Sequence, residues 1–401
     1  MAESQGAFYE RLAGRGVSRR DFLKFCGSVA ALLGLSQTWA ATIATKVAEA
    51  AESGLYPALW LNGGGCTGCS ESIAQSADPS VAEIVLDILS LNYIETLMMA
   101  MGADADEAII STAEEHEGNF ILLYEGAIME GWDGNALRIA GKPSVEQVKE
   151  VAAKAAACIS VGSCAVDGGL VRSYPNPSKA TGLAPFLQKE GISTPVINLP
   201  GCPANPEHIV AIVVDALILG TLENGKILDK LDEFGRPKYL FGQTIHDNCP
   251  RRGHFENGEF VYEFGTEEEA KGYCLYPVGC KGPQTQTTCP VTRWNGQTSW
   301  CVEAGAPCIG CAQYNWVDNS TPFLGRVRPV GRGKLGGPSG VDPAWAAAAV
   351  GGVVAVGLVA HGFGMKAAGR IGKNAKLENE PMKEYDAKRQ KKGVSVAKGG
   401  E

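Results

Sequence analysis

The chain has 401 residues, is 45% hydrophobic, and carries 51 glycines and a formal net charge of -8. A chain of this length can bury one large core or two moderate ones, and we expect two domains. The acidic balance provides no general basic surface, which excludes nucleic acid as the expected partner and favours a protein or a small substrate.

A twin-arginine export signal is predicted over residues 1–50. Ser18 to Lys24 reads SRRDFLK and is followed by a mildly apolar run that ends near small residues at 48–51. An arginine pair, an apolar stretch and small residues in this order are typical of such a signal. The alternative is an ordinary amphipathic helix with a chance Arg-Arg pair. A signal of this type exports proteins that are already folded, so a metal cofactor can be installed before export.

A flavodoxin-like, doubly wound parallel β-sheet is predicted over residues 55–220, which places the chain in the α/β class. Short apolar runs typical of buried strands alternate there with stretches typical of helices. The strand-like runs are 57–61, 120–123, 155–161 and 196–199, and the helix-like stretches are 79–101 and 144–157.

Cysteines follow three of the predicted strands. Cys66, Cys164 and Cys202 come just after apolar runs, and the carboxyl ends of parallel strands meet at one edge of an open sheet. We therefore expect these three side chains to lie together at that edge. Nucleotide binding is the weaker interpretation, because the glycines at 63–65 lack the Lys-Ser/Thr ending of a phosphate loop.

A second, loop-rich domain is predicted over residues 226–319. Glycine, proline, cysteine, tryptophan and charged residues dominate it, and long apolar runs are few. Such a segment cannot easily build a core from aliphatic side chains, so we expect bound metal clusters to supply much of its order.

A transmembrane helix is predicted over residues 344–365. These 22 residues contain no Asp, Glu, Lys or Arg and are long enough to cross a bilayer, although a buried core helix is the alternative. A basic tail follows at 366–401 and is expected to stay cytoplasmic. The predicted topology therefore has the body facing the periplasm and the C-terminus inside the inner membrane.

The 13 cysteines point to metal ligation. Single Cys-x-x-Cys pairs are ambiguous, because zinc, redox and iron-sulfur sites all use them. An exported protein often forms disulfides, so a zinc- and disulfide-stabilised structural protein remains an alternative. Export of a folded protein and the odd number of cysteines favour metal.

Three groups of motifs together resemble the small subunits of nickel-iron hydrogenases. The first group is Cys66-Thr-Gly-Cys69, Gly162-Ser-Cys164 and Pro200-Gly-Cys202-Pro. A related first group occurs in a subunit of respiratory NADH:quinone oxidoreductase. The second group, His246-Asp-Asn-Cys249 with Cys274 and Cys280-Lys-Gly-Pro, and the third, Cys289-Pro-Val-Thr with Cys308-Ile-Gly-Cys311, separate the two families.

The resemblance implies three iron-sulfur clusters. The implied ligands are Cys66, Cys69, Cys164 and Cys202 for a proximal 4Fe-4S cluster; His246, Cys249, Cys274 and Cys280 for a distal 4Fe-4S cluster; and Cys289, Cys301, Cys308 and Cys311 for a medial cluster. Most relatives have proline at the position of Cys301, and they bind a three-iron medial cluster. A fourth thiolate predicts a 4Fe-4S cluster there as well, whereas an unligated Cys301 would leave 3Fe-4S.

The implied function is that of the small subunit of an uptake hydrogenase. It would relay electrons from H2 oxidation in a large subunit, which carries the nickel-iron centre, to an integral cytochrome b or quinone-reducing membrane module. A dimer of such heterodimers is possible in the family. No catalytic residue is predicted in this chain, and Cys26 and Cys158 fall outside the three sets. The alternative from another class is a membrane-anchored iron-sulfur subunit of a different oxidoreductase.

Overall fold

The computed structural model describes residues 8–10, 12–14, 17–53, 56–75, 89–321, 323–325 and 343–368. They belong to two compact units, residues 1–327 and residues 328–401. The predicted loop-rich domain is part of the first unit, together with the predicted sheet. The predicted basic tail lies outside the described residues beyond position 368.

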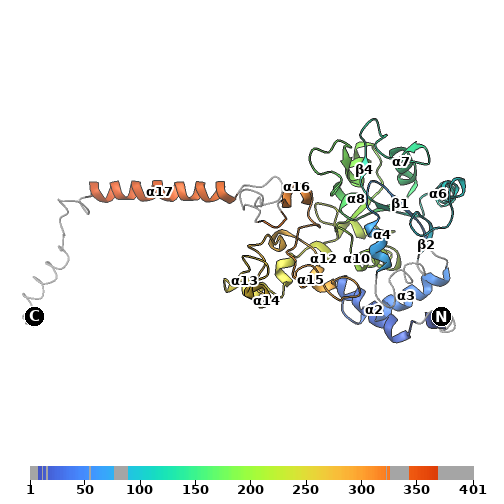
Figure 1. The fold of residues 1–401 in the computed structure, drawn as a ribbon, viewed down its shortest axis with the longest axis horizontal. Coiled ribbons are helices and arrows are strands. Elements are labelled where there is room, and N and C mark those ends of the chain that lie inside the picture. The colour runs from blue at the N-terminus through green and yellow to red at the C-terminus, as the bar shows by residue number, and fades with distance from the viewer. Residues whose placement is uncertain are drawn as a thin grey trace, which may run out of the picture. The chain divides into compact units, whose positions relative to one another are not determined.

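A five-stranded parallel sheet forms the centre of the first unit (Figure 1), which confirms the predicted α/β class. Its strands are β1 (Tyr56–Asn62), β2 (Leu89–Ile94), β3 (Ile121–Glu125), β7 (Ala157–Val161) and β9 (Val196–Leu199), in the spatial order β2-β1-β3-β7-β9. Counted along the chain this order is 2-1-3-4-5, as in flavodoxin-like sheets. The shorter strands are β4 (Ile128–Met129), β5 (Arg138–Ile139), β6 (Lys142–Pro143) and β8 (Ala180–Thr181).

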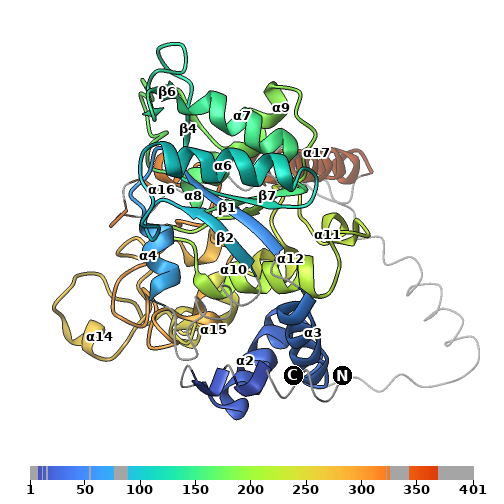
Figure 2. The same cartoon turned by 90° about the vertical axis from the view of Figure 1, so that its right-hand side faces the viewer.

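Helices cover both faces of the sheet (Figure 2). Leu59 and Trp60 are neighbours in β1 but belong to different apolar cores, because successive side chains of a strand point to opposite faces. The helices of one face are α6 (Ala103–Glu115), α7 (Ser144–Lys154) and α9 (Leu183–Lys189), and those of the other are α10 (Pro206–Val213) and the π-helix η1 (Val214–Ile218). Both faces are buried, as is usual for parallel sheets.

The expectation of a helix over residues 79–101 was wrong for its second half, where β2 forms. Leu89 to Ile94 reads LSLNYI, and β2 pairs in parallel with β1. The first half of the expected helix, residues 79–88, lies outside the described part of the chain. Backbone pairing with β1 prevails here over a local apolar spacing that suits either type of element.

The predicted export signal folds into a helical hairpin on the body. Its helices are α2 (Arg19–Leu32) and α3 (Trp39–Ser53). Phe22, Cys26 and Val47 are buried in the same core as α10 and η1, whereas Arg19 and Arg20 are exposed. The hairpin therefore buries its apolar residues and leaves the arginine pair accessible; its role in export stays a prediction.

Residues 220–321 contain only short helical elements, consistent with the predicted scarcity of regular structure. They are α11 (Lys226–Asp229), α12 (Lys238–Phe241), η2 (Ile245–Asn248), α13 (Arg252–Glu256), α14 (Glu267–Ala270), η3 (Gly282–Gln284), α15 (Cys289–Thr292) and α16 (Trp316–Ser320). A small apolar core that includes Trp300 and Val302 lies among them, and cysteines pack against it.

In its described residues, 343–368, the second unit forms one long helix, α17 (Pro343–Ala367). Its stretch Ala348–Ala367 has a mean hydropathy of 1.8, and none of it is buried. A core helix of a soluble domain would be buried, so the exposed apolar surface favours the membrane-span prediction over that alternative.

Candidate metal centres

The four cysteines of the first set converge at the carboxyl edge of the sheet, as predicted. Cys66 and Cys69 follow β1, Cys164 opens α8 (Ser163–Asp167) after β7, and Cys202 follows β9. Burial raises the pKa of Cys202 to about 11, and the nearby thiols of Cys164 and Cys66 contribute to this rise. Burial also raises the pKa of Cys69 strongly, with contributions from Glu125, Cys164 and Cys202. The four sulfurs are therefore close enough to influence one another.

Glycines leave space around these sulfurs. At Gly162, whose φ is +87°, an added Cβ would collide with Cys69 Sγ. At Gly169 it would lie 3.0 Å from Cys164 Sγ, and at Gly68 it would lie 3.1 Å from Cys66 Sγ. The backbone at this edge is shaped for close approach to a group held by the thiols.

A buried carboxylate, Glu125 at the end of β3, holds the first cysteine loop in place. Its oxygens accept hydrogen bonds from Trp60 Nε1 at 3.0 Å, from Cys69 N at 2.8 Å and from Ser70 N at 3.1 Å. Ser70 Oγ also donates to it, at 2.5 Å. Because Cys69 and Ser70 lie in the first turn of α4 (Gly68–Ala74), the carboxylate also caps that helix.

The second set lines one small cavity in the loop-rich part of the body. His246, Cys249, Cys274 and Cys280 all contribute to its wall. Burial raises the pKa of each of the three thiols, and Cys280 and Cys249 influence Cys274 directly. The structure thus brings together all four residues that the sequence assigned to the distal site.

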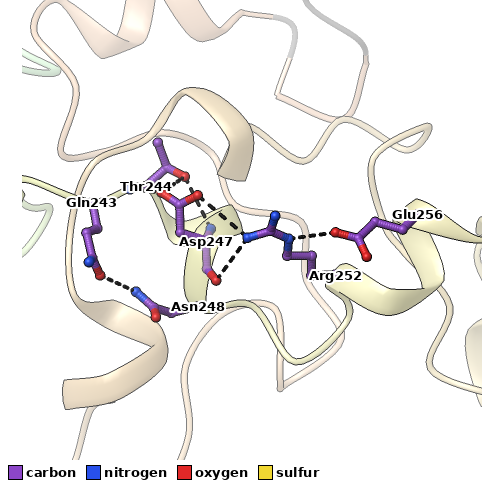
Figure 3. Close-up of polar contacts among 6 residues, drawn as sticks. All are labelled: Gln243, Thr244, Asp247, Asn248, Arg252 and Glu256. Atoms are coloured by element: carbon purple, nitrogen blue, oxygen red, sulfur yellow. Dashed lines mark hydrogen bonds and ion pairs between the residues drawn. The ribbon is translucent and has the colours of Figure 1, made fainter.

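Polar contacts fix the short helix that carries His246 (Figure 3). Thr244 and Asp247 form a reciprocal capping box. Arg252 makes two ion pairs: its Nη1 lies 3.8 Å from Asp247 Oδ1, and its Nε lies 2.8 Å from Glu256 Oε1. Burial, followed by the positive charge of Arg252, lowers the pKa of His246. A lowered pKa favours the neutral imidazole, which is the form that binds metals.

The third set lines a cavity of about 350 Å³. Cys289, Cys301, Cys308 and Cys311 all face it, together with Trp294 and Trp300 and with Cys202 of the first set. Burial raises the pKa of Cys289 to about 11, and Cys301 is among the nearby groups that raise it. Cys301 is thus placed among the other three thiols and not apart from them.

Hydrogen bonds join the three sets in series. The first and third meet at the cavity of the third set, which Cys202 also lines, and Ser163 Oγ donates to the Cys311 carbonyl at 2.5 Å while accepting from Gly201 N at 2.9 Å. The third and second meet where the N–H of Lys281, the residue after Cys280, donates to the Cys308 carbonyl at 2.7 Å. The order along the molecule is therefore first, third and second.

The donor chemistry and the shape of the three sites fit iron-sulfur clusters. Eleven thiols and one imidazole form three sets of four, and soft thiolates with an occasional histidine are the ligands of such clusters. All 13 cysteines lie in the described part of the chain, and none forms a disulfide. Within that part, no three acidic, His or Cys side chains are drawn together as tightly as ligands of a single ion. Because burial raises the pKa of thiols in each of the three sets, cluster binding would release protons.

Sequence reasoning missed Glu125, Ser163 and Lys281 as residues that support these sites. Glu125 had a recognisable signal, because it is a charged residue at the end of the otherwise apolar run ILLYE and is only 4% exposed. Ser163 and Lys281 each adjoin a cysteine that is predicted to be a ligand, but their partners are distant in sequence, so no local pattern identifies them.

Comparison with known families agrees with this geometry. Residues 241–324 match the family model for the C-terminal part of the small subunits of NiFe/NiFeSe hydrogenases. Residues 66–216 match that of the NADH ubiquinone oxidoreductase 20 Kd subunit. The fold and the sites thus define an iron-sulfur protein of the oxidoreductase class.

Individual relatives narrow this class. The chain is 43% identical over 315 residues to the periplasmic [NiFe] hydrogenase small subunit of Solidesulfovibrio fructosivorans, covering 78% of this chain and 95% of the relative. It is 40% identical over 311 residues to the quinone-reactive Ni/Fe-hydrogenase small chain of Wolinella succinogenes, covering 77% and 84%. The [NiFeSe] hydrogenase structure from Desulfovibrio vulgaris Hildenborough superposes with a TM-score of 0.63 at 36% identity, covering 68% of this chain and 98% of that one. The chain belongs to the small-subunit family of nickel-iron hydrogenases, whose active site lies in the large subunit.

Proposed function

We propose that this chain relays electrons from H2 oxidation in a large subunit through three 4Fe-4S clusters to a quinone-linked acceptor in the membrane. A bound 4Fe-4S cluster accepts and releases one electron at a time. The observation that carries the proposal is that the three sets adjoin in series: Cys202 lines the cavity of the third set, and Lys281, which follows Cys280, donates its N–H to the Cys308 carbonyl.

Each set is proposed to hold one cluster. Cys66, Cys69, Cys164 and Cys202 would hold the proximal one; Cys289, Cys301, Cys308 and Cys311 the medial one; and His246, Cys249, Cys274 and Cys280 the distal one. A neutral imidazole in place of a thiolate removes one negative charge, which favours a higher potential at the His246 site. That site is therefore suited to be the exit for electrons.

The large subunit is proposed to dock at the sheet edge that carries the proximal set. Three large apolar side chains are exposed there: Trp132 is 65% exposed, Leu170 55% and Tyr174 88%. Leu170 follows Gly169, which packs against Cys164, and Gly131 donates a backbone hydrogen bond to Ser178 at 2.7 Å, which joins the loops that carry Trp132 and Tyr174. Exposed apolar groups of this size mark a protein interface.

Anchoring in the inner membrane through α17 is part of the proposal. The span from Ala348 to Ala367 is apolar and exposed, and lysines and arginines follow it in the sequence, which favours a cytoplasmic C-terminus and a periplasmic body. The twin-arginine motif fits export of the folded body. The name of the quinone-reactive relative supports a membrane partner that is a cytochrome b or another quinone-reducing module.

Metal analysis of the intact membrane complex, combined with H2-dependent dye reduction, tests the proposed function. We expect about twelve irons in this subunit, as three complete 4Fe-4S sites require, and nickel in the large subunit that copurifies with it. Iron without nickel in any partner would favour another oxidoreductase, which the match to the 20 Kd subunit family allows. A colourless complex that contains zinc would contradict both interpretations.

Replacing Cys301 by proline tests the medial assignment. Cys301 is the fourth thiol at the cavity shared with Cys289, Cys308 and Cys311, so its removal is expected to leave three ligands and a three-iron cluster. Iron content should fall by about one atom, and an intense signal of the oxidised three-iron form should appear in electron paramagnetic resonance spectra.

The matched control is Cys158→Ala, which removes a buried thiol in β7 outside the three sets. It should leave both the iron content and the spectrum unchanged. Unchanged iron and spectrum in Cys301→Pro would show that Cys301 is not a ligand.

A further inference from the structure

Lys281 lies at the junction between the second and third sets. It directly follows Cys280, and its backbone N–H donates to the Cys308 carbonyl at 2.7 Å. Its own carbonyl accepts from Thr285 Oγ1 at 2.6 Å, and its stem packs against Gly310, between Cys308 and Cys311. One residue therefore contacts the loops of both sets.

The side chain of Lys281 is buried, with 3% of the residue exposed, and its amino group is surrounded by carbonyl oxygens. Nζ donates to Gly279 O at 2.6 Å, to Gly325 O at 2.8 Å and to Phe323 O at 3.2 Å. An ammonium group has three N–H donors, whereas a neutral amine has two and a lone pair. The three carbonyl acceptors match the three donors of the charged form, and they replace part of the hydration that burial removes. Burial lowers the pKa of Lys281, whereas the neighbouring thiols of Cys280 and Cys308 raise it.

These contacts also hold the last described segment of the first unit against the metal sites. Gly279 has a φ of +109°, and an added Cβ there would lie 2.6 Å from Phe323 O and 2.7 Å from Gly325 N. The backbone at 323–325 thus lies directly on the turn before Cys280. Through one buried side chain and its backbone, Lys281 therefore contacts this segment, the turn before Cys280 and the loop from Cys308 to Cys311.

We propose that Lys281 is a positioning residue whose fixed positive charge raises the reduction potentials of both the medial and the distal cluster. A nearby cation favours the form of a cluster that has gained an electron, and the effect is strong where water is excluded. Because Lys281 adjoins ligands of both sets, the two potentials rise together and stay close to each other. The inference rests on the proposed function, since it requires clusters at both sites.

The experiment is a redox titration of the purified heterodimer, followed by electron paramagnetic resonance at constant pH. Lys281→Gln keeps a polar group of similar length but removes the charge. We expect the medial and distal midpoint potentials to shift downward while the proximal one stays unchanged. The matched control is Lys271→Met, which removes an exposed lysine that pairs with Glu267 on α14 and should shift none of the three.

The possible results separate the alternatives. A Lys281→Gln protein with full iron content and unchanged midpoints overturns the proposal. If that variant loses iron, Lys281→Arg decides: iron retained with wild-type midpoints supports the role of the charge, and iron lost there too shows that only the shape of lysine matters, which overturns it. An iron content of the wild-type protein well below the twelve atoms of three 4Fe-4S clusters would instead contradict the proposed function.

Discussion

Replacing Gly162 by alanine is expected to destroy the proximal site and to lower the iron content by about four atoms per chain, the content of one cluster. Gly162 joins β7 to α8 with φ +87° and ψ 158°, a region of backbone conformation that is almost restricted to glycine. An added Cβ would also collide with Cys69 Sγ. Strain and collision act at the same point, so neither can be relieved without moving the strand end or the cysteine.

Two further variants separate these causes. Gly141→Ala places alanine at another positive φ, +79°, where nothing lies within 4 Å of the new Cβ; it should cost about 1 kcal/mol of stability from strain alone and retain all iron. The double variant Gly162→Ala/Cys69→Ala removes the sulfur that the new methyl group meets. It should recover part of the thermal stability lost in Gly162→Ala without recovering the iron. Full iron content in Gly162→Ala would show that the edge is less tightly constrained than its geometry indicates.

The sheet edge could be predicted from the sequence because its signals are local. Each of Cys66, Cys164 and Cys202 follows an apolar run, and parallel strands bring their carboxyl ends together whatever the connecting helices are. The strand at 89–94 was harder to predict, since an apolar spacing in isolation suits a helix as well, and only pairing with β1 decides it. The packing of α2 and α3 on α10 likewise depends on the surface that α10 presents in the folded protein, which cannot be predicted from the sequence of α2 and α3 alone.

The contacts between the three sets could not be predicted from the sequence. Ser163 meets Cys311 across 148 positions, and Lys281 meets Gly325 across 44. Such hydrogen bonds depend on how loops without regular structure fold over one another, and no periodic pattern encodes that. The ligand types, their grouping and the order proximal, medial, distal could be predicted from motifs and the family resemblance; the residues through which the groups touch required the structure.

Replacing Glu125 by alanine is expected to destabilise the body by about 3–5 kcal/mol and to release the first cysteine loop. The change leaves four donors without their acceptor: Trp60 Nε1, the N–H groups of Cys69 and Ser70, and Ser70 Oγ. Each buried donor left unpaired costs about 1–3 kcal/mol, and part of that cost is avoided where the loop moves toward water. Because whole domains are stable by only about 5–15 kcal/mol, the loss should be visible as a lower urea midpoint and a lower iron content.

Glu125→Gln and Glu130→Ala provide the comparison. Glutamine keeps one acceptor oxygen but turns an N–H₂ group toward donors, so its effect should lie between those of glutamate and alanine. Glu130 lies five positions further along and pairs with Lys189, whose side chain is 61% exposed. Exposed pairs of this kind contribute about 0–1 kcal/mol, so Glu130→Ala should change little. Equal urea midpoints for Glu125→Ala and Glu130→Ala would mean that the donors of the first cysteine loop find other acceptors. A large loss of stability and iron in Glu125→Ala alone would instead show that the buried carboxylate at the end of β3 holds Cys69 in the position that the proximal site requires. This carboxylate is part of no cysteine motif.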